Sequence, residues 1–321
     1  MKTKQNNFGV VSLLAGLAAF LCAGLAQAKP FYGDDDLQSA PYFISDQTLS
    51  AMSKNTAALF ESRDVSPAGR LRTATMRQAY NLCPDEPHAE EPVGSYCTGV
   101  IVGHRLLLTA GHCLKPGCGN IKIIINYKNG MLRDRPLQPG DIYQCESAVN
   151  TGVPGAAGDL ALIKLDRAVP SALTDVSPLK PQPGMRVVSI AYPKGMPQKI
   201  QNEAKITAAS DKAFMLDADS FHGSSGSPVF DEEGRVLGIL VNGLGEDFTP
   251  DAAAGCNRFT RLAKDRHELL SKSVDPAYTE MASDFAGVKG VVQAGALAVW
   301  AAPGLSKYFA KNGLKKLGLQ N

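Results

Sequence analysis

Short apolar runs separated by Gly, Pro, Asp and Asn fill the chain from residue 32 to about residue 273. Each run is only a few residues long and rich in Val, Ile and Leu, which is typical of β-strands joined by turns. The pattern therefore predicts an all-β domain made of many short strands. The clearest runs are residues 98–102, 121–127, 160–165, 185–191, 229–230 and 236–241.

Two segments interrupt this pattern and divide the domain. Residues 166–184, DRAVPSALTDVSPLKPQPG, contain several prolines and predict a linker between two β units, at about residues 32–166 and 184–262. Residues 262–272 have apolar positions at helical spacing and predict a helix that closes the domain, which ends near residue 273.

The remaining residues, 274–321, form an extension of different character. Residues 285–302 are apolar and rich in Gly and Ala, interrupted only by Lys289 and Gln293, and residues 304–321 carry four lysines and no acid. We expect an extra helical tail. It is either a helix packed on the domain, a removable propeptide, or a membrane-active helix that gives peripheral membrane contact.

The first 28 residues predict an export signal. Lys2 and Lys4 precede an apolar stretch, and Ala26-Gln27-Ala28 has the small-x-small form of a cleavage site. The mature chain is expected to begin near Lys29, in the periplasm of a bacterium or in its medium. The charge is nearly balanced, with 33 basic and 31 acidic residues, so no overall field favours nucleic acid as a partner.

Cysteine usage agrees with an exported protein. One of the seven cysteines, Cys22, lies in the signal, which leaves an even number in the mature chain, as expected for disulfides formed in an oxidising compartment. There is no CxxC pair and no histidine cluster at ligand spacing, so we expect no metal and no other cofactor. The six are Cys83, Cys97, Cys113, Cys118, Cys145 and Cys256.

Three segments carry residues suited to hydrolysis by an activated serine. His112 follows an apolar strand in LLLTAGHCL, Asp159 opens an apolar strand in GAAGDLALIKLDR, and Ser225 lies in the turn FHGSSGSPVF. Such chemistry needs a hydroxyl, a base, a group that orients the base and donors for the oxyanion. The amides of Gly223 and Ser225 are the candidate donors. Taken singly, each residue has a structural interpretation, as a strand-end histidine, a turn acid or a loop serine.

Together these segments resemble the chymotrypsin-like (trypsin-fold) serine proteases. TAGHC, DLALIKL and GSSGSP match the family's histidine, aspartate and nucleophile motifs in the family's order, and the resemblance covers most of the chain from Tyr32 to Ser273. It implies two antiparallel β-barrels with the active site between them. It also implies that Ser225 is the nucleophile, His112 the base and Asp159 the residue that orients the base.

The resemblance implies a disulfide between Cys97 and Cys113. The other four cysteines allow three pairings, which the sequence leaves open. Ser224 stands where animal digestive enzymes have an Asp that pairs with a new N-terminal amine, so we expect no such ion pair. GSSGSP instead resembles the motif of bacterial glutamyl endopeptidase-like peptidases, although Leu240 replaces the histidine that glutamyl enzymes carry.

Residue preference before the scissile bond is predicted from the same resemblance. Asp219 lies six residues before Ser225, the offset of the acid that recognises Arg or Lys in trypsin-type enzymes, and a carboxylate favours a cationic side chain there. Phe221 replaces the cysteine that normally braces this loop. The full expected substrate-binding set is Asp219, Ser220, His222, Val241, Asn242 and Gly243.

The sequence thus predicts a monomeric, secreted serine endopeptidase that acts on polypeptide substrates, with a preference for Arg or Lys. Two other classes stay open. One is a catalytically inactive protease-fold binding protein, and the other is a membrane-active protein that uses its C-terminal helix.

Overall fold

The computed structural model describes residues 29–32, 35–41, 44–131, 136–150, 159–170, 173–210, 213–242, 246–262 and 290–293. The described part is mostly β, with two short α-helices. The predicted export signal, residues 1–28, lies outside the described residues.

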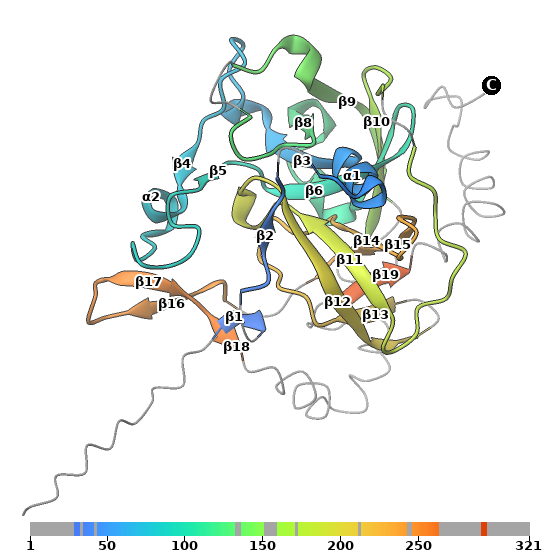
Figure 1. Cartoon of the computed structure of the whole chain (residues 1–321). Helices are drawn as coiled ribbons and strands as arrows, with labels where there is room; N and C mark the ends of the chain where they lie inside the picture. Colours follow the sequence, from blue (N-terminus) through green and yellow to red (C-terminus); the bar gives the residue numbers. More distant parts are fainter. Residues whose placement is uncertain are drawn as a thin grey trace, which may run out of the picture.

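A closed barrel of six strands is formed by the N-terminal half of the described chain, in the upper part of Figure 1. The strands pair in the order β10-β7-β6-β3-β8-β9, and neighbours in this order are antiparallel. β10 is buried along its whole length, which explains why its sequence is almost continuously apolar. The barrel strands are β3 (Thr56–Glu61), β6 (Cys97–Gly103), β7 (Leu106–Ala110), β8 (Ile121–Ile125), β9 (Ile142–Asn150) and β10 (Leu160–Leu165).

A second sheet of seven strands lies below the barrel in Figure 1. Its order is β11-β14-β15-β19-β13-β12-β2, and β11 also pairs with β12. The pairing of β11 with β12 joins the two ends of the series from β11 to β12. β2 lies outside this series as an edge strand on β12. Its strands are β2 (Gln38–Ser39), β11 (Arg186–Ala191), β12 (Lys199–Ala209), β13 (Ala213–Leu216), β14 (Pro228–Phe230), β15 (Val236–Leu240) and β19 (Gly290–Gln293).

The C-terminal extension contributes a strand where the sequence predicted a helical tail. β19 pairs with β13 on one side and with β15 on the other. The prediction was wrong for these residues because Val291 and Val292 favour a strand once the folded domain offers a position between β13 and β15. The rest of residues 274–321 lies outside the described residues. Among the described residues, no helix is long and apolar enough to cross a membrane.

The prediction of a closing helix over residues 262–272 is also wrong at its first residue. Leu262 lies in β18 (Arg261–Leu262), which pairs in parallel with the N-terminal strand β1 (Lys29–Tyr32), so a long-range contact overrides the local helical spacing. Residues 263–272 lie outside the described residues. The remaining strands are β4 (Ala74–Thr75), β5 (Pro92–Val93), β16 (Phe248–Asp251) and β17 (Cys256–Phe259).

Both α-helices begin with a side-chain cap. α1 (Gln47–Lys54) starts after Asp46, whose carboxylate accepts the amide of Leu49 at 2.7 Å. α2 (Met76–Tyr80) starts after Thr75, and Thr75 and Gln78 form a reciprocal capping box. Such caps satisfy amides that have no partner within the first helical turn.

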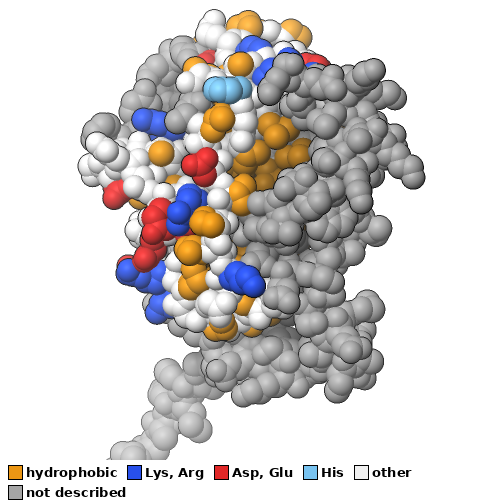
Figure 2. All heavy atoms as spheres, turned by 90° about the vertical axis from the view of Figure 1, so that its right-hand side faces the viewer, with side chains coloured by type: hydrophobic (Ala, Val, Ile, Leu, Met, Phe, Trp, Pro, Cys, Tyr) orange, Lys and Arg blue, Asp and Glu red, His pale blue; other side chains and the backbone are white. Residues whose placement is uncertain are grey.

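One apolar core spans the barrel and the second sheet. It joins Leu107 and Ile163 of the barrel to Ile190, Phe230 and Ile239 of the second sheet. The predicted linker is fixed to the second sheet, since Ser177 donates its amide to the carbonyl of Val236 at 2.9 Å. The two β units therefore share packed surface. On the face shown in Figure 2, acidic and basic side chains are interspersed, as the nearly balanced charge predicts.

Three disulfides connect the six cysteines that follow residue 28. The predicted bond between Cys97 and Cys113 is present, and the structure selects one of the three open pairings for the rest. The second bond joins Cys118, in the turn before β8, to Cys145 of the neighbouring strand β9, over 27 residues of chain. The third joins Cys83 to Cys256 over 173 residues.

Candidate active site

The register between β7 and β10 brings His112 and Asp159 together. Leu160, at the start of β10, pairs with Ala110, at the end of β7, so Asp159 faces the residues that follow β7. His112 lies there in a 3₁₀ turn (Gly111–Leu114). The Asp159 carboxylate holds His112 twice. It accepts the His112 amide at 2.8 Å and lies 2.7 Å from Nδ1.

This contact sets the roles of the two imidazole nitrogens. Asp159 is buried, with 1% of its side chain exposed, whereas His112 is 24% exposed. An ionised carboxylate only accepts hydrogen bonds, so Nδ1 of the neutral ring carries the proton and Nε2 is left as an acceptor. The arrangement gives a base with a fixed tautomer. Gly111 makes the approach possible, since a Cβ there would lie 2.7 Å from Asp159 Oδ1.

Hydrogen bonds to Thr98 bring the Ser225 loop next to His112. Thr98 follows Cys97 in β6, and its amide donates to the carbonyl of Ser225 at 2.8 Å. Its hydroxyl donates to the carbonyl of Gly223 at 2.9 Å. Cys113, directly after His112, has its sulfur 3.7 Å from the Ser225 carbonyl oxygen. The barrel thus holds the backbone of Ser225 close to Cys113, the residue that follows His112.

The two predicted oxyanion donors lie in a turn with unusual backbone. Gly223 has φ of 97° and Gly226 has φ of 87°, values that favour glycine. Among the described residues, the amides of Gly223 and Ser225 donate no intramolecular hydrogen bond. They are therefore available to an outside acceptor, as an oxyanion site requires. Ser225 itself is partly exposed, while Ser224 and Ser227 are buried.

Phe221 supplies the bracing that the absent cysteine would have given. Its ring packs edge-on against Phe31 at 5.4 Å and Phe259 at 5.2 Å between centroids. Its carbonyl accepts the amide of Ser224 at 2.9 Å. Phe31, in the N-terminal strand β1, thus supports residues 221–227 through aromatic packing. We call these residues, which include Ser225, the nucleophile loop.

A matched pair of glycine substitutions tests how tightly this loop is packed. Gly184 and Gly226 have φ of 86° and 87°, but a Cβ at Gly184 would meet nothing within 4 Å, whereas a Cβ at Gly226 would overlap the carbonyl oxygen of Thr98. Gly184→Ala is expected to cost about 1–2 kcal/mol of unfolding free energy from backbone strain alone. Gly226→Ala should cost about 1–3 kcal/mol more. Urea unfolding of both variants measures the difference, and equal costs would contradict the packing described here.

The predicted substrate-binding residues surround the loop to different extents. Asp219 is buried, with 3% exposed, and its Oδ2 accepts the amide of Asp36 at 3.0 Å, so this carboxylate contacts the N-terminal segment. Ser220 and Val241 are also buried, and Asn242 is partly buried. Gly243 lies outside the described residues.

His222 is the most exposed member of the predicted set. Its side chain is 79% exposed, and its Nδ1 lies 2.6 Å from Asp247 Oδ2. The hydrogen bond to Asp247 raises the pKa of His222 above the usual value. Burial would raise the pKa of Asp247, but His222 and Lys194 outweigh it and lower that pKa. A positive charge at His222 is therefore favoured directly before the candidate oxyanion donors.

Sequence reasoning missed Thr98 as a site residue. Thr98 is fully buried and hydrogen bonded to the nucleophile loop, yet within CTGVIV it is only a polar residue in an apolar strand. A buried hydroxyl needs a partner, which was the available signal. The local sequence does not indicate that the partner is Gly223, which is 125 positions away.

Cys97, His112 and Cys113 place two sulfurs and a ring nitrogen within 4.8 Å of one another. Both sulfurs belong to one disulfide. A cysteine binds a metal ion as a thiolate, so these two sulfurs are not metal ligands while the disulfide is intact. His112 keeps its Asp159 partner instead.

Comparison with known proteins agrees with this geometry. Residues 97–239 match the family model of the trypsin-like peptidase domain. The match confirms the resemblance that was predicted from the three motifs. The matched segment contains all three candidate catalytic residues.

Curated relatives include the glutamyl endopeptidases of Staphylococcus aureus. The protein of strain MW2 is 26% identical over 170 residues, which are 50% of this chain and 50% of that protein. The chain thus spans about half the length of the curated relatives it matches. Among solved structures, a Glu endopeptidase in complex with MPD is 14% identical with a TM-score of 0.45, covering 76% of this chain and 98% of its own. Human heparin binding protein is 15% identical with a TM-score of 0.44, covering 75% and 97%.

Proposed function

We propose that the protein is a serine endopeptidase in which Ser225, His112 and Asp159 form the catalytic triad. The observation that carries this proposal is the double contact of the buried Asp159 with His112, at 2.8 Å and 2.7 Å. Two further observations support the proposal: the sulfur of Cys113, the residue after His112, lies 3.7 Å from the Ser225 carbonyl oxygen, and residues 97–239 match the trypsin-like peptidase domain. The coordinated placement of base, orienting acid and serine supports acyl transfer more than any structural role.

The proposed reaction follows from the roles of these groups. Ser225 Oγ attacks the carbonyl carbon of the scissile bond and gives its proton to His112 Nε2, while the amides of Gly223 and Ser225 stabilise the oxyanion. The imidazolium then protonates the leaving amine, and an acyl-enzyme remains on Ser225. A water molecule then gives a proton to His112 and attacks the carbonyl carbon of the acyl-enzyme. The bond to Ser225 Oγ breaks, Oγ takes back the proton from His112, and the carboxylic acid product leaves.

Labelling with a fluorophosphonate probe tests the proposal against an inactive binding protein. The probe reacts covalently with an activated serine, so the wild-type protein is expected to label and Ser225→Ala is not. A folded wild type that never labels would support the binding-protein alternative. Retained labelling in Ser225→Ala would show that another serine is the nucleophile.

Preference for Arg or Lys before the scissile bond is part of the same proposal, with Asp219 as the recognition residue. Its carboxylate is buried in the loop that precedes Ser225, which supports recognition of a cation. Glutamate is the competing preference, because the staphylococcal relatives are glutamyl endopeptidases. The histidine that glutamyl enzymes carry is replaced here by Leu240, at the end of β15, whose backbone pairs with Gly226 and Ser227.

Peptides that differ only in this residue decide between the two. A charge-assisted contact is worth about 1.5–3 kcal/mol, so Arg and Lys peptides should be cleaved about 10-fold to 100-fold faster than Phe or Glu peptides. The ratio of kcat/KM values measures the preference. Equal rates would remove Asp219 from the recognition site, and faster cleavage after Glu would contradict its assignment.

We also propose that the protein is exported and works on polypeptides outside the cytoplasm. The three disulfides support an oxidising compartment. The predicted signal supports the same route, with cleavage near Ala28. Mass spectrometry of the protein recovered from the periplasm or medium should find Lys29 as the first residue.

A further inference from the structure

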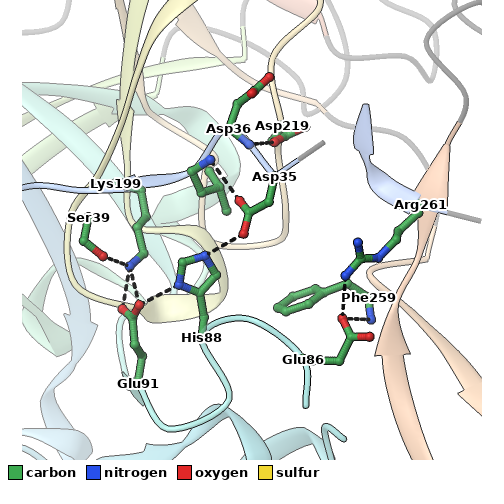
Figure 3. Close-up of polar contacts among 11 residues, drawn as sticks. Asp35, Asp36, Ser39, Glu86, His88, Glu91, Lys199, Asp219, Phe259 and Arg261 are labelled. Atoms are coloured by element: carbon green, nitrogen blue, oxygen red, sulfur yellow. Dashed lines mark hydrogen bonds and ion pairs between the residues drawn. The ribbon is translucent and has the colours of Figure 1, made fainter. Parts of the chain in front are cut away.

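A segment near the N-terminal end of the described chain contacts the loop that leads to Ser225. We call residues 35–39 the N-terminal strap (Figure 3). Its last two residues form β2, which pairs with Lys199 and Ile200 of β12. Leu37 is buried in the same cluster as Phe221. The strap is therefore part of the folded domain.

One hydrogen bond joins the strap to the loop before Ser225. The amide of Asp36 donates to Asp219 Oδ2 at 3.0 Å. Asp219 is held from the other side by Gln201, which accepts its amide at 2.6 Å and donates to its carbonyl at 2.8 Å. The position of Asp219 thus depends on the strap as well as on β12.

His88 holds the strap from below in Figure 3, between two carboxylates. Its Nε2 lies 3.1 Å from Asp35 Oδ2 on the strap, and its Nδ1 lies 2.6 Å from Glu91 Oε1. The side chain of His88 is only 12% exposed. His88 has φ of 61°, a left-handed conformation that is uncommon outside glycine and that its surroundings must maintain.

The number of protons on His88 decides whether both contacts can exist. An ionised carboxylate cannot donate, and a neutral imidazole has one N–H, so only the doubly protonated ring can donate to Asp35 and Glu91 together. Glu91 has the shorter contact and is fixed by Lys199 Nζ at 2.5 Å and 2.6 Å. Loss of one proton should therefore release Asp35.

The surrounding charges favour the doubly protonated ring. Burial would lower the pKa of His88, but the hydrogen bonds to Asp35 and Glu91 outweigh burial and raise that pKa above the usual 6.5. Lys199, from β12, opposes the charge, and its own pKa is lowered by burial. Two other groups lie nearby in the described structure: Tyr127, whose pKa is raised by burial and by Glu91, and Glu86, which pairs with Arg261.

The sign of the pH dependence follows from this direction. A group whose pKa is raised by folding stabilises the folded state at pH values below its unfolded pKa, and this contribution disappears as pH rises through the folded value. The hold of His88 on Asp35 is therefore complete in mild acid. It is lost above the raised pKa.

We propose that His88 is a positioning residue, which in its doubly protonated form fastens the N-terminal strap and through Asp36 fixes Asp219 and the loop that presents Gly223 and Ser225. The proposal rests on the proposed peptidase function. His88 touches no substrate and acts only through the strap. Release of Asp35 in alkali loosens the strap and then the loop.

Hydrogen exchange of the full-length protein tests the strap without using activity. Exchange of the amides in residues 36–40 and 219–226 is followed by mass spectrometry from about pH 5.5 to about pH 9.5, corrected for intrinsic exchange. In the wild type, protection of both segments is expected to fall by about tenfold to a hundredfold as pH rises. In His88→Gln, protection should be low at every pH. His104→Gln, at an exposed histidine in the turn after β6, should behave like the wild type.

A second variant keeps the test decisive if His88→Gln does not fold. Asp35→Asn replaces the carboxylate with an amide, which can accept from the doubly protonated ring and can donate to Nε2 of the neutral ring, so the strap should stay protected across the pH range. In the active wild-type enzyme, kcat/KM should decline on the alkaline side with the same midpoint as the loss of protection, and this decline should be absent in Asp35→Asn.

Protection of residues 36–40 that falls with pH in both variants as it does in the wild type would overturn the proposal. So would a strap that loosens while residues 219–226 keep their protection and kcat/KM keeps its profile. If fluorophosphonate labels no serine, the peptidase function fails, but the coupled exchange of the two segments still supports or overturns the role of His88.

Discussion

Ser225→Ala is expected to lower kcat by about 10⁶-fold, because the substitution removes the only group that can form the acyl-enzyme in the proposed reaction. The residual rate would come from the oxyanion amides and from substrate binding, which alanine leaves in place. The measurement is kcat for a peptide ester or amide, with active protein counted by mass and folding checked by circular dichroism.

The neighbouring serines of the GSSGSP motif provide matched controls. Ser224 is buried and its Oγ accepts the amide of Phe221 at 3.4 Å, while Ser227 donates to the carbonyl of Ser224 at 2.5 Å. Loss of one such hydrogen bond costs about 1 kcal/mol, so Ser224→Ala and Ser227→Ala should lose no more than about tenfold in kcat. A Ser225→Ala enzyme as active as these controls would refute the assignment of the nucleophile.

Asp159→Asn should have the second largest effect, a fall in kcat of about 10⁴-fold. The amide of asparagine can donate to Nδ1, so the ring would carry its proton on Nε2 and could no longer accept the Ser225 proton. The His112 amide, which now donates to Asp159 Oδ1 at 2.8 Å, could still bond to the asparagine oxygen. The fold should therefore survive while the chemistry fails.

Asp166→Asn, at the other end of β10, is the control for this effect. Asp166 is exposed and accepts the amide of Gln144 at 3.0 Å, directly after the end of β10 that lies away from Asp159. Its variant should keep nearly full kcat. If Asp159→Asn retained more than about a tenth of wild-type kcat, His112 would not depend on Asp159 for its tautomer.

The sequence predicted those features that are encoded locally. Apolar runs of Val, Ile and Leu placed β6, β8, β10, β11 and β15 close to their observed bounds, because buried strands need little beyond their own composition. The candidate triad was predicted from three short motifs. The fold supplies what the motifs leave out, namely the register that places Leu160 opposite Ala110.

Features that depend on contacts between distant residues were not predictable. Cys83 and Cys256 are 173 residues apart, and four cysteines allow three pairings that no local pattern separates. Leu262 and β19 were expected to be helical from their own spacing and became strands through pairing with β1, β13 and β15. The role of His88 was not predicted, because its partner Asp35 lies 53 residues away in the sequence.

Thr98 links two parts of the chain that are synthesised at different times. Its backbone belongs to the barrel, while its amide and hydroxyl hold the carbonyls of Ser225 and Gly223 in the later-made half of the chain. Hydrolytic geometry therefore exists only after both halves have docked. A nascent or partly folded copy is therefore expected to lack hydrolytic activity.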